Sequence, residues 1–428
     1  MEDQNEPLTE VGTSIELFSG GGGLALAMHR AGFRHLVMNE FAPRACETLL
    51  KNGAVKRKSE DHIPLALNDE WPLIQGDIRE FQFGYLAGKV DVVAGGPPCQ
   101  PFSLGGVHKG DEDTRNMFPQ LFRVVEQTRP NAIICENVRG LLRTSFRPYF
   151  EYILRELSLP FEKRAKDASW ETHNAQLIQR DLEIPQDSEE RYVVVPIEVN
   201  AADYGVPQVR NRVIIVAFKA SLGITAEDWL QRFAPRKSHS REALIRSQLD
   251  GSYWERHSEV RGSVRDAVAQ SLPSALPIAD ETLPWRTLRD ALYGNPDRPH
   301  EPPLPKDVVD KAEHPSGMWV HHIGWPGARI YAGHTPNYLD RPAKTVKAGV
   351  HGVPGGESVM LLDDGSHRYM TVRETARVMT FPDSWRLAGP RGEQMRQLGN
   401  AVPVELGRVF ATAVADALKW AAGQQRSR

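Results

Sequence analysis

Apolar residues along this chain fall into short continuous runs that alternate with longer amphipathic stretches. Short apolar runs bounded by glycine or polar residues are typical of buried strands, whereas amphipathic stretches with a helical period are typical of helices. The sequence predicts strands at 14–18, 35–39, 73–78, 90–94, 131–138, 192–199 and 213–218, and helices at 24–31, 43–51, 117–128 and 371–379, with a last helix that reaches about 422. Between 150 and 191 one helical piece and a polar surface stretch are expected, and from 220 to 340 the periodicity is poor.

A glycine-rich stretch, Ser19 to Gly23, connects the first predicted strand to the first predicted helix. Such a loop lets the backbone approach a cofactor at a helix N-terminus. Glu40 ends the second strand, twenty positions after Gly20, and a carboxylate at that separation suits hydrogen bonding to ribose hydroxyls. Nicotinamide-dependent enzymes share this arrangement, so a nicotinamide oxidoreductase stays open at this point, as does a glycine loop without a ligand.

The string GGPPCQPFS, residues 95–103, follows the predicted strand at 90–94. Prolines on both sides of Cys99 fix the backbone. A cysteine on a stiff turn has a defined direction, which a nucleophilic thiolate requires. The plain alternative for a lone cysteine is a proline-rich turn in which the side chain only packs.

Two further groups of charged residues lie at predicted strand ends. Glu136 lies near the end of the strand at 131–138, at the edge where parallel sheets bind ligands. Arg210 and Arg212 belong to the string QVRNR, and residues at i and i+2 on an extended backbone point to one side. A solvent-exposed strand end and surface ion pairs are the alternatives.

Composition sets broad limits on the class of protein. The 428 residues carry a formal charge of −3, are 40% hydrophobic and 25% charged, and contain no apolar run of membrane-spanning length. The N-terminal MEDQNEPLTE is polar and acidic, unlike a secretory signal. Cys46, Cys99 and Cys135 are widely spaced, so neither disulfides nor a metal site is expected, and a reducing cytoplasm fits. Five basic residues against one glutamate between 232 and 246 are a candidate phosphate-binding stretch or a solvated face.

Six strings resemble, in order and spacing, the motifs of the DNA cytosine-5 methyltransferases: ELFSGGGG (16–23), GGPPCQ (95–100), ENV (136–138), QVRNR (208–212), RPAKTV (341–346) and GNAVPV (399–404). The resemblance spans nearly the whole chain. It departs from the family's pattern at Glu16, where aspartate is usual, and at an extra glycine, Gly21, which is expected to loosen the loop.

The resemblance implies an α/β fold, with a doubly wound, mostly parallel Rossmann-like sheet and a smaller target-recognition domain. The implied organisation is a disordered arm at 1–12, a catalytic cofactor-binding domain at 13–219, a target-recognition domain at 220–370, and a return to the catalytic domain at 371–428. A stretch at 107–116 is expected to be a mobile lid that closes over DNA.

The resemblance also implies roles for individual residues. Cys99 would add to C6 of cytosine, Glu136 would contact N3 and the amino group, and Arg212 would hold O2 with Arg210 assisting. S-adenosyl-L-methionine would be bound by Phe18, Ser19, Gly20, Gly21, Gly22, Gly23, Glu40, Phe41, Asp77, Ile78, Gly96, Pro98, Phe118, Asn400 and Ala401. DNA would be contacted by Gln100, Ser103, Arg236, Lys237, Arg341 and Lys344.

The expected function is therefore site-specific methylation of double-stranded DNA by a cytoplasmic monomer, as the modification half of a type II restriction–modification system. A cognate restriction endonuclease would be a functional partner, and neither a membrane nor a metal is expected. Alternatives are a related enzyme acting on transfer RNA and a catalytically silent DNA-binding relative. The transfer-RNA group has a shorter recognition region and a CFT-like string, and neither appears here. The intact PPCQ, ENV and QVRNR strings argue against a silent relative.

Overall fold

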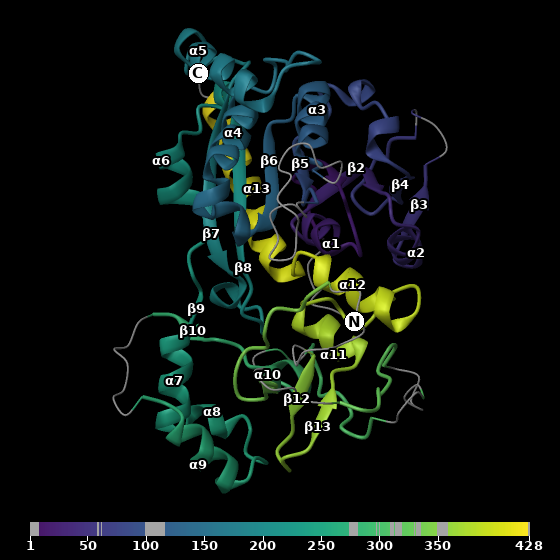
Figure 1. The fold of residues 1–428 in the computed structure, drawn as a ribbon, viewed down its shortest axis with the longest axis vertical. Helices are drawn as coiled ribbons and strands as arrows, with labels where there is room; N and C mark the ends of the chain where they lie inside the picture. The colour runs from purple at the N-terminus through teal and green to yellow at the C-terminus, as the bar shows by residue number, and fades with distance from the viewer. Residues whose placement is uncertain are drawn as a thin grey trace. The chain divides into compact units, whose positions relative to one another are not determined.

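The computed structural model describes residues 8–57, 60, 62–98, 116–273, 281–296, 298, 300–308, 312, 319–328, 330, 335–348 and 358–426. Residues 1–7 of the expected N-terminal arm lie outside this range. The chain divides into two units, and Figure 1 shows their elements. The large unit contains Leu8–Val199, Asn211–Pro235 and Gly407–Arg428, and the small unit contains Asn200–Arg210 and Arg236–Leu406.

An eight-stranded sheet forms the centre of the large unit, in the order β3-β4-β2-β1-β5-β6-β8-β7. Neighbours from β3 to β6 pair in parallel, and β8 runs antiparallel to β6. The strands are β1 (Gly12–Leu17), β2 (Phe33–Glu40), β3 (Ala54–Lys56), β4 (Trp71–Gln75), β5 (Val92–Gly95), β6 (Ala132–Val138), β7 (Tyr192–Asn200) and β8 (Asn211–Lys219). The expected doubly wound, mostly parallel sheet is therefore confirmed.

The chain reverses its direction of growth across the sheet at β1. From β1 it continues outward to β2, and β5 later pairs with the other side of β1. Ligands of such sheets bind outside the carboxyl ends of the strands at this switch point. The segments that follow β1 and β5 are the glycine loop and the Gly96–Pro98 segment, so both lie at the place where this fold forms a site.

Helices of the large unit connect and cover these strands (Figure 1). They are α1 (Gly23–Arg30), α2 (Pro43–Lys51), α3 (Phe118–Thr128), α4 (Arg147–Ser158), α5 (Trp170–Glu183), α6 (Ala226–Asp228) and most of α13 (Val404–Arg426). Proline occupies one of the first two positions of α2, α3 and α4, where its missing N–H costs nothing. Phe118, Leu121 and Val125 of α3 are fully buried in the main apolar core, which also includes Ile133 of β6.

The small unit has shorter elements. Its helices are α7 (Arg241–Asp250), α8 (Ser252–Glu255), α9 (Gly262–Gln270), α10 (Leu288–Tyr293), α11 (Val372–Val378) and α12 (Arg391–Asn400). Its strands are β9 (His239–Ser240), β10 (Leu283–Pro284), β11 (Asn337–Tyr338), β12 (Val359–Leu361) and β13 (His367–Tyr369). A capping box formed by Thr371 and Glu374 is present at the start of α11, within the helix predicted at 371–379.

Buried arginines hold much of the small unit together. The Arg289 side chain is fully buried and donates to both carboxylate oxygens of Asp340 at 2.6 and 2.9 Å, and to those of Asp363 at 2.6 and 2.8 Å. The Tyr253 hydroxyl donates to Asp340 at 2.8 Å. The bonds from Arg289 hold the pKa of Asp363 below its usual range. A charge this deeply buried is tolerated because each donor faces a carboxylate.

Three features differ from the sequence-based expectations. The polar stretch after 170 is the helix α5, in which His173 and Leu177 are the buried residues. The three-residue strand β3 was not predicted, and the region from 220 to 340 contains α7 to α10. The expected domain bounds stay a prediction, and residues 371–406 belong to the small unit. Which unit contacts DNA stays a prediction.

We predict that Arg289→Met destabilises the small unit strongly. The substitution keeps much of the side-chain volume but leaves the Asp340 carboxylate buried without its main cation, a change that costs about 3–5 kcal/mol. Urea unfolding followed by circular dichroism measures this loss. Arg44→Met is the matched control, because the Arg44–Glu47 pair is 51% and 44% exposed and its loss should hardly move the midpoint. Equal midpoints for the two variants would contradict the prediction.

Candidate active site

The glycine loop after β1 has an unusual backbone. Phe18 has a φ of 55°, although it is not glycine, and Gly20 and Gly22 have φ of 54° and 92°. Such φ values in bulky residues are uncommon and often mark functional sites. The Ser19 N–H donates to the Asn39 carbonyl at 3.0 Å, and the Ser19 hydroxyl lies 3.1 Å from the Glu16 carbonyl. These bonds fix the turn that leads into α1.

Glu40 is tied to this loop. One carboxylate oxygen accepts the Gly20 N–H at 2.6 Å, and the other accepts the Ala42 N–H at 2.7 Å. Burial raises the pKa of Glu40, and these backbone donors offset only part of that effect. Because a carboxylate oxygen has two lone pairs, each oxygen can accept one more hydrogen bond. The structure therefore brings Glu40 to the glycine loop, as the sequence predicts.

Glu16, which stands where the family usually has aspartate, lies inside the sheet. Its carboxylate is 2.7 Å from the Nδ1 atom of His35 on β2, and both side chains are 1% exposed. The His35 ring packs against Trp71, with ring centroids 4.5 Å apart. The longer side chain of glutamate thus reaches a histidine on the neighbouring strand, and it stabilises the β1–β2 pair that carries the glycine loop and Glu40.

Asp77 follows β4 and has a local partner that the sequence did not reveal. The Arg79 Nε atom lies 2.9 Å from Oδ1 of Asp77, and Nη2 lies 2.5 Å from Oδ2. This hydrogen bonding lowers the pKa of Asp77 below its ordinary value. Arg79 therefore holds the carboxylate ionised and orients it, while Ile78 beside it is buried.

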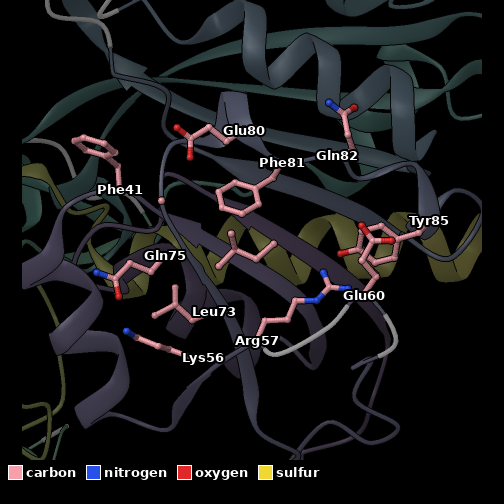
Figure 2. A pocket seen from close by; sticks show the side chains of 12 residues that line it. Phe41, Lys56, Arg57, Glu60, Leu73, Gln75, Glu80, Phe81, Gln82 and Tyr85 are labelled. Atoms are coloured by element: carbon pink, nitrogen blue, oxygen red, sulfur yellow. The ribbon is translucent and has the colours of Figure 1, made fainter.

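A cavity of about 730 Å³ lies beside these residues on the β3–β4 side of the sheet (Figure 2). Its aromatic wall contains Phe41, which is 70% exposed, with Phe81 and Tyr85. The Arg57 guanidinium lies over the Tyr85 ring, 4.3 Å from its centroid. Phe41 is the one predicted cofactor residue that lines this cavity. No residue of the glycine loop lines it, so the cavity is not formed by that loop.

The segment before Cys99 lies next to the end of β6. In the parallel pairing of β5 with β6, Gly95 is opposite Cys135. The Asn137 side chain donates to the Pro97 carbonyl at 3.1 Å. A Cβ atom on Gly96 would lie 3.5 Å from the Glu136 carboxylate. The structure thus places Gly96 against Glu136 and leads the chain toward Cys99, which itself lies outside the described residues.

Arg212 forms an ion pair with Glu136. Its Nε atom is 2.7 Å from Oε1 of Glu136, and each side chain is 11% exposed. In the antiparallel pairing of β6 with β8, Val138 is opposite Arg212, so the end of one strand meets the start of the other. The two side chains that the sequence assigned to the ring of cytosine are therefore in direct contact.

Arg210 binds backbone carbonyls. Its guanidinium is 1% exposed and donates to the carbonyls of Val346, Gly399 and Ala401 at 2.8–3.0 Å. That Arg210 and Arg212 project to one side stays a prediction, and Arg210 precedes β8, which begins at Asn211. Arg210 belongs to the small unit and Arg212 to the large one.

The remaining cofactor candidates differ in exposure. Phe118 is fully buried and packs on Phe122 with ring centroids 6.0 Å apart. Pro98 and Asn400 are exposed, and Ala401 is buried.

The structure describes four of the six residues that are candidates for DNA contact. Arg236 is exposed, whereas the Lys237 ammonium forms an ion pair with Asp203 at 2.9 Å. Arg341 lies over the Tyr338 ring, 5.2 Å from its centroid, and the Lys344 ammonium donates to the Thr335 carbonyl. Gln100, Ser103 and the expected lid at 107–115 lie outside the described residues, as do 349–357 of the glycine-rich stretch after Lys344.

The two described cysteines are buried free thiols. Cys46 donates to the Glu40 carbonyl, and burial raises its pKa to about 12. Cys135 packs in the main core. Among the described residues, no group of three or more histidine, cysteine, aspartate or glutamate side chains is placed to hold a metal ion.

Comparison with protein families gives one match over most of the chain. The model of the C-5 cytosine-specific DNA methylase family matches residues 12–160 and 184–416. The chain belongs to this family.

Relatives of this methylase are similar over nearly the full length of this chain. The type II methyltransferase M.NgoMIV of Neisseria gonorrhoeae is 28% identical over 95% of this chain and 98% of its own. M.Eco47II of Escherichia coli, also a type II methyltransferase, is 28% identical over 94% of this chain and 79% of its own. The DNMT2 structure from Spodoptera frugiperda has 16% identity, a TM-score of 0.53, and coverage of 94% and 99% of the two chains. This last likeness shows the fold alone.

In the parts of the methylase that the structure describes, no helix is long and apolar enough to cross a membrane.

We predict that Cys99 is the thiol that reacts fastest in the folded methylase. Cys46 and Cys135 are buried, and a protonated buried thiol is a poor nucleophile. Limited labelling with iodoacetamide followed by peptide mass mapping should modify Cys99 first. Cys46→Ala, the matched control, should keep the fast phase and Cys99→Ala should lose it. Equal labelling of all three cysteines in native protein would refute this assignment.

Proposed function

We propose that this protein is a site-specific DNA cytosine-5 methyltransferase and the modification enzyme of a type II restriction–modification system. The observation that carries the proposal is the Glu136–Arg212 pair at the sheet edge, beside the segment that leads into Cys99. The curated relatives that resemble nearly the whole chain are type II methyltransferases, which favours DNA over transfer RNA.

The residues at the glycine loop fit S-adenosyl-L-methionine. Gly20 and Gly22 adopt the left-handed conformation that lets backbone approach a ligand closely. The Glu40 carboxylate retains acceptor capacity for ribose hydroxyls, and the Arg79-oriented Asp77 offers acceptors for an adenine amino group. Phe18 and Ile78 would supply apolar contacts. When bound, this cofactor supplies the electrophilic methyl group.

The chain's own residues would activate the cytosine ring. C5 of cytosine is a poor nucleophile because its attack disrupts aromaticity. The Cys99 thiolate forms a bond to C6, and the electron pair of the C5–C6 double bond becomes available at C5 for the methyl group. Glu136, by donating a proton toward N3, lets negative charge leave the ring, a general-acid contribution of roughly 100- to 10,000-fold.

Arg212 has two roles in this proposal. It supplies a fixed positive charge to O2, where electron density grows as the thiolate adds. It also holds the Glu136 carboxylate in place, because the two side chains are already 2.7 Å apart. After methyl transfer a base removes the C5 proton, and the S–C6 bond breaks, which regenerates the Cys99 thiolate and the C5–C6 double bond. N3 returns its proton to Glu136 in the same step.

The target base must leave the duplex for this chemistry, because C6 is covered by stacking and methyltransferases flip their target. Base recognition by a few side chains and phosphate contacts by exposed cations such as Arg236 would select the site. Lys237 is a weaker candidate than the sequence indicated, since Asp203 already neutralises it.

The proposal is tested by mapping 5-methylcytosine at base resolution in DNA from a methylation-free host that expresses the protein. We expect one cytosine in one short recurring sequence to be methylated, and Cys99→Ala to lose all methylation while it still binds the same DNA. Unmodified DNA from soluble wild-type protein that binds the cofactor would refute a DNA substrate. Full methylation by Cys99→Ala would place the nucleophile elsewhere.

The raised pKa of Glu40 predicts a pH-dependent affinity for S-adenosylhomocysteine. The ionised carboxylate accepts ribose hydroxyls, so affinity should fall as pH drops through the pKa of Glu40, and at a higher pH than for an exposed glutamate. Isothermal titration calorimetry across pH measures this fall. Glu40→Gln should bind more weakly and with a flatter pH profile. Asp77→Asn is the control, because the pKa of Asp77 is lowered and this variant should keep the wild-type slope.

A further inference from the structure

The QVRNR segment has two arginines with unlike partners. Arg212 contacts Glu136 in the large unit, whereas the Arg210 guanidinium donates to three backbone carbonyls of the small unit. An arginine that is 1% exposed and engaged on three carbonyls is poorly placed to supply charge to a substrate. Its partners therefore indicate its role.

Two of those carbonyls flank Asn400. Arg210 Nη2 donates to the Gly399 carbonyl at 2.8 Å and to the Ala401 carbonyl at 3.0 Å. Gly399 lies in the last turn of α12, where carbonyls lack partners within the helix and a cation is favourable. The guanidinium thus binds carbonyls at the C-terminal end of α12 and holds the Gly399–Asn400 and Ala401–Val402 peptide groups, and Asn400 between them is exposed.

The third carbonyl connects this turn to a second segment. Arg210 Nη1 donates to the Val346 carbonyl at 3.0 Å, and the Val346 N–H donates to the buried Gln208 side chain at 3.0 Å. The following residues pack so closely on Gly399 that a Cβ there would lie 2.5 Å from the Lys347 carbonyl carbon and the Ala348 nitrogen. The turn at Asn400 is therefore fixed by the Arg210 hydrogen bonds and by the close packing of Lys347 and Ala348 on Gly399.

We propose that Arg210 is a positioning residue for the cofactor, which it serves by fixing the Asn400–Ala401 turn, and that it does not contact the target base. The inference rests on the proposed function, because the family resemblance assigns Asn400 and Ala401 to S-adenosylmethionine. The two arginines of the QVRNR segment thus have different roles. Arg212 acts on the target base, and Arg210 raises the affinity for the cofactor.

The test compares Arg210→Lys with Arg212→Lys in the full-length protein. Lysine keeps the charge but lacks the planar fork that reaches several carbonyls at once. For Arg210→Lys we expect the Kd for S-adenosylhomocysteine and the KM for S-adenosylmethionine to rise about 10- to 100-fold, with kcat at saturating cofactor changed by less than about threefold. For Arg212→Lys we expect kcat to fall about 100-fold with an unchanged Kd.

Two further variants separate positioning from loss of folding. Gly399→Ala moves the same turn while Arg210 stays in place, and it should show the same rise in Kd with a retained thermal melting transition. In an Asn400→Ala background, Arg210→Lys should weaken binding far less than it does alone, because both changes act on one turn.

An unchanged Kd with a reduced kcat for Arg210→Lys would overturn the inference and return Arg210 to the base. Additive effects of Arg210→Lys and Asn400→Ala would also overturn it. Failure of the wild-type protein to bind S-adenosylhomocysteine would instead refute the proposed function, and this inference with it.

Discussion

The contact between Glu136 and Arg212 depends on the direction of one strand. Glu136 lies near the carboxyl end of β6, and Arg212 lies at the start of β8. Because β8 is antiparallel to β6, its start meets the edge at which β6 ends. A parallel strand in that position would carry Arg212 to the opposite edge of the sheet, well over 10 Å away at about 3.3 Å per residue. The reversal after five parallel pairings is thus what places a cation beside the acid. The rest of the site follows from the parallel strands, which bring the glycine loop, Asp77 and the Gly96–Pro98 segment to the same edge.

The two units are stabilised by different interactions. The large unit buries apolar residues on both faces of its sheet, such as the neighbours Ile133 and Ile134 of β6, as parallel sheets require. In the small unit, arginines such as Arg289 and Arg373 are fully buried and bind carboxylates or backbone carbonyls. Short elements leave many backbone carbonyls without partners, and a guanidinium with five donors satisfies several of them at once. Arg210 is one of this group, which explains why its sequence motif alone suggested a different role.

Sequence patterns predicted the parts of the molecule that obey simple periods. The helix Pro43–Lys51 and most strands of the sheet follow from amphipathic stretches and apolar runs. The strand β3 has three residues and is too short to show a period, and α5 has too few buried positions to form an apolar stripe. The bonds from Arg210 to the carbonyls of Val346, Gly399 and Ala401 join residues far apart in the sequence, so no local pattern indicates them. Arg79 was missed because its bond to Asp77 is a local contact that any exposed arginine two residues after an aspartate can make.

The large unit is not contiguous along the chain. Its last element, α13, follows the whole of the small unit, and its residues Phe410, Val414 and Ala417 are buried. Trp420 near its end packs against Phe233, with ring centroids 5.8 Å apart. During synthesis the large unit therefore cannot be completed until α13 has left the ribosome. A chain that terminates early lacks part of its core rather than a dispensable tail, so incomplete products of this gene should be recognised as unfolded and degraded.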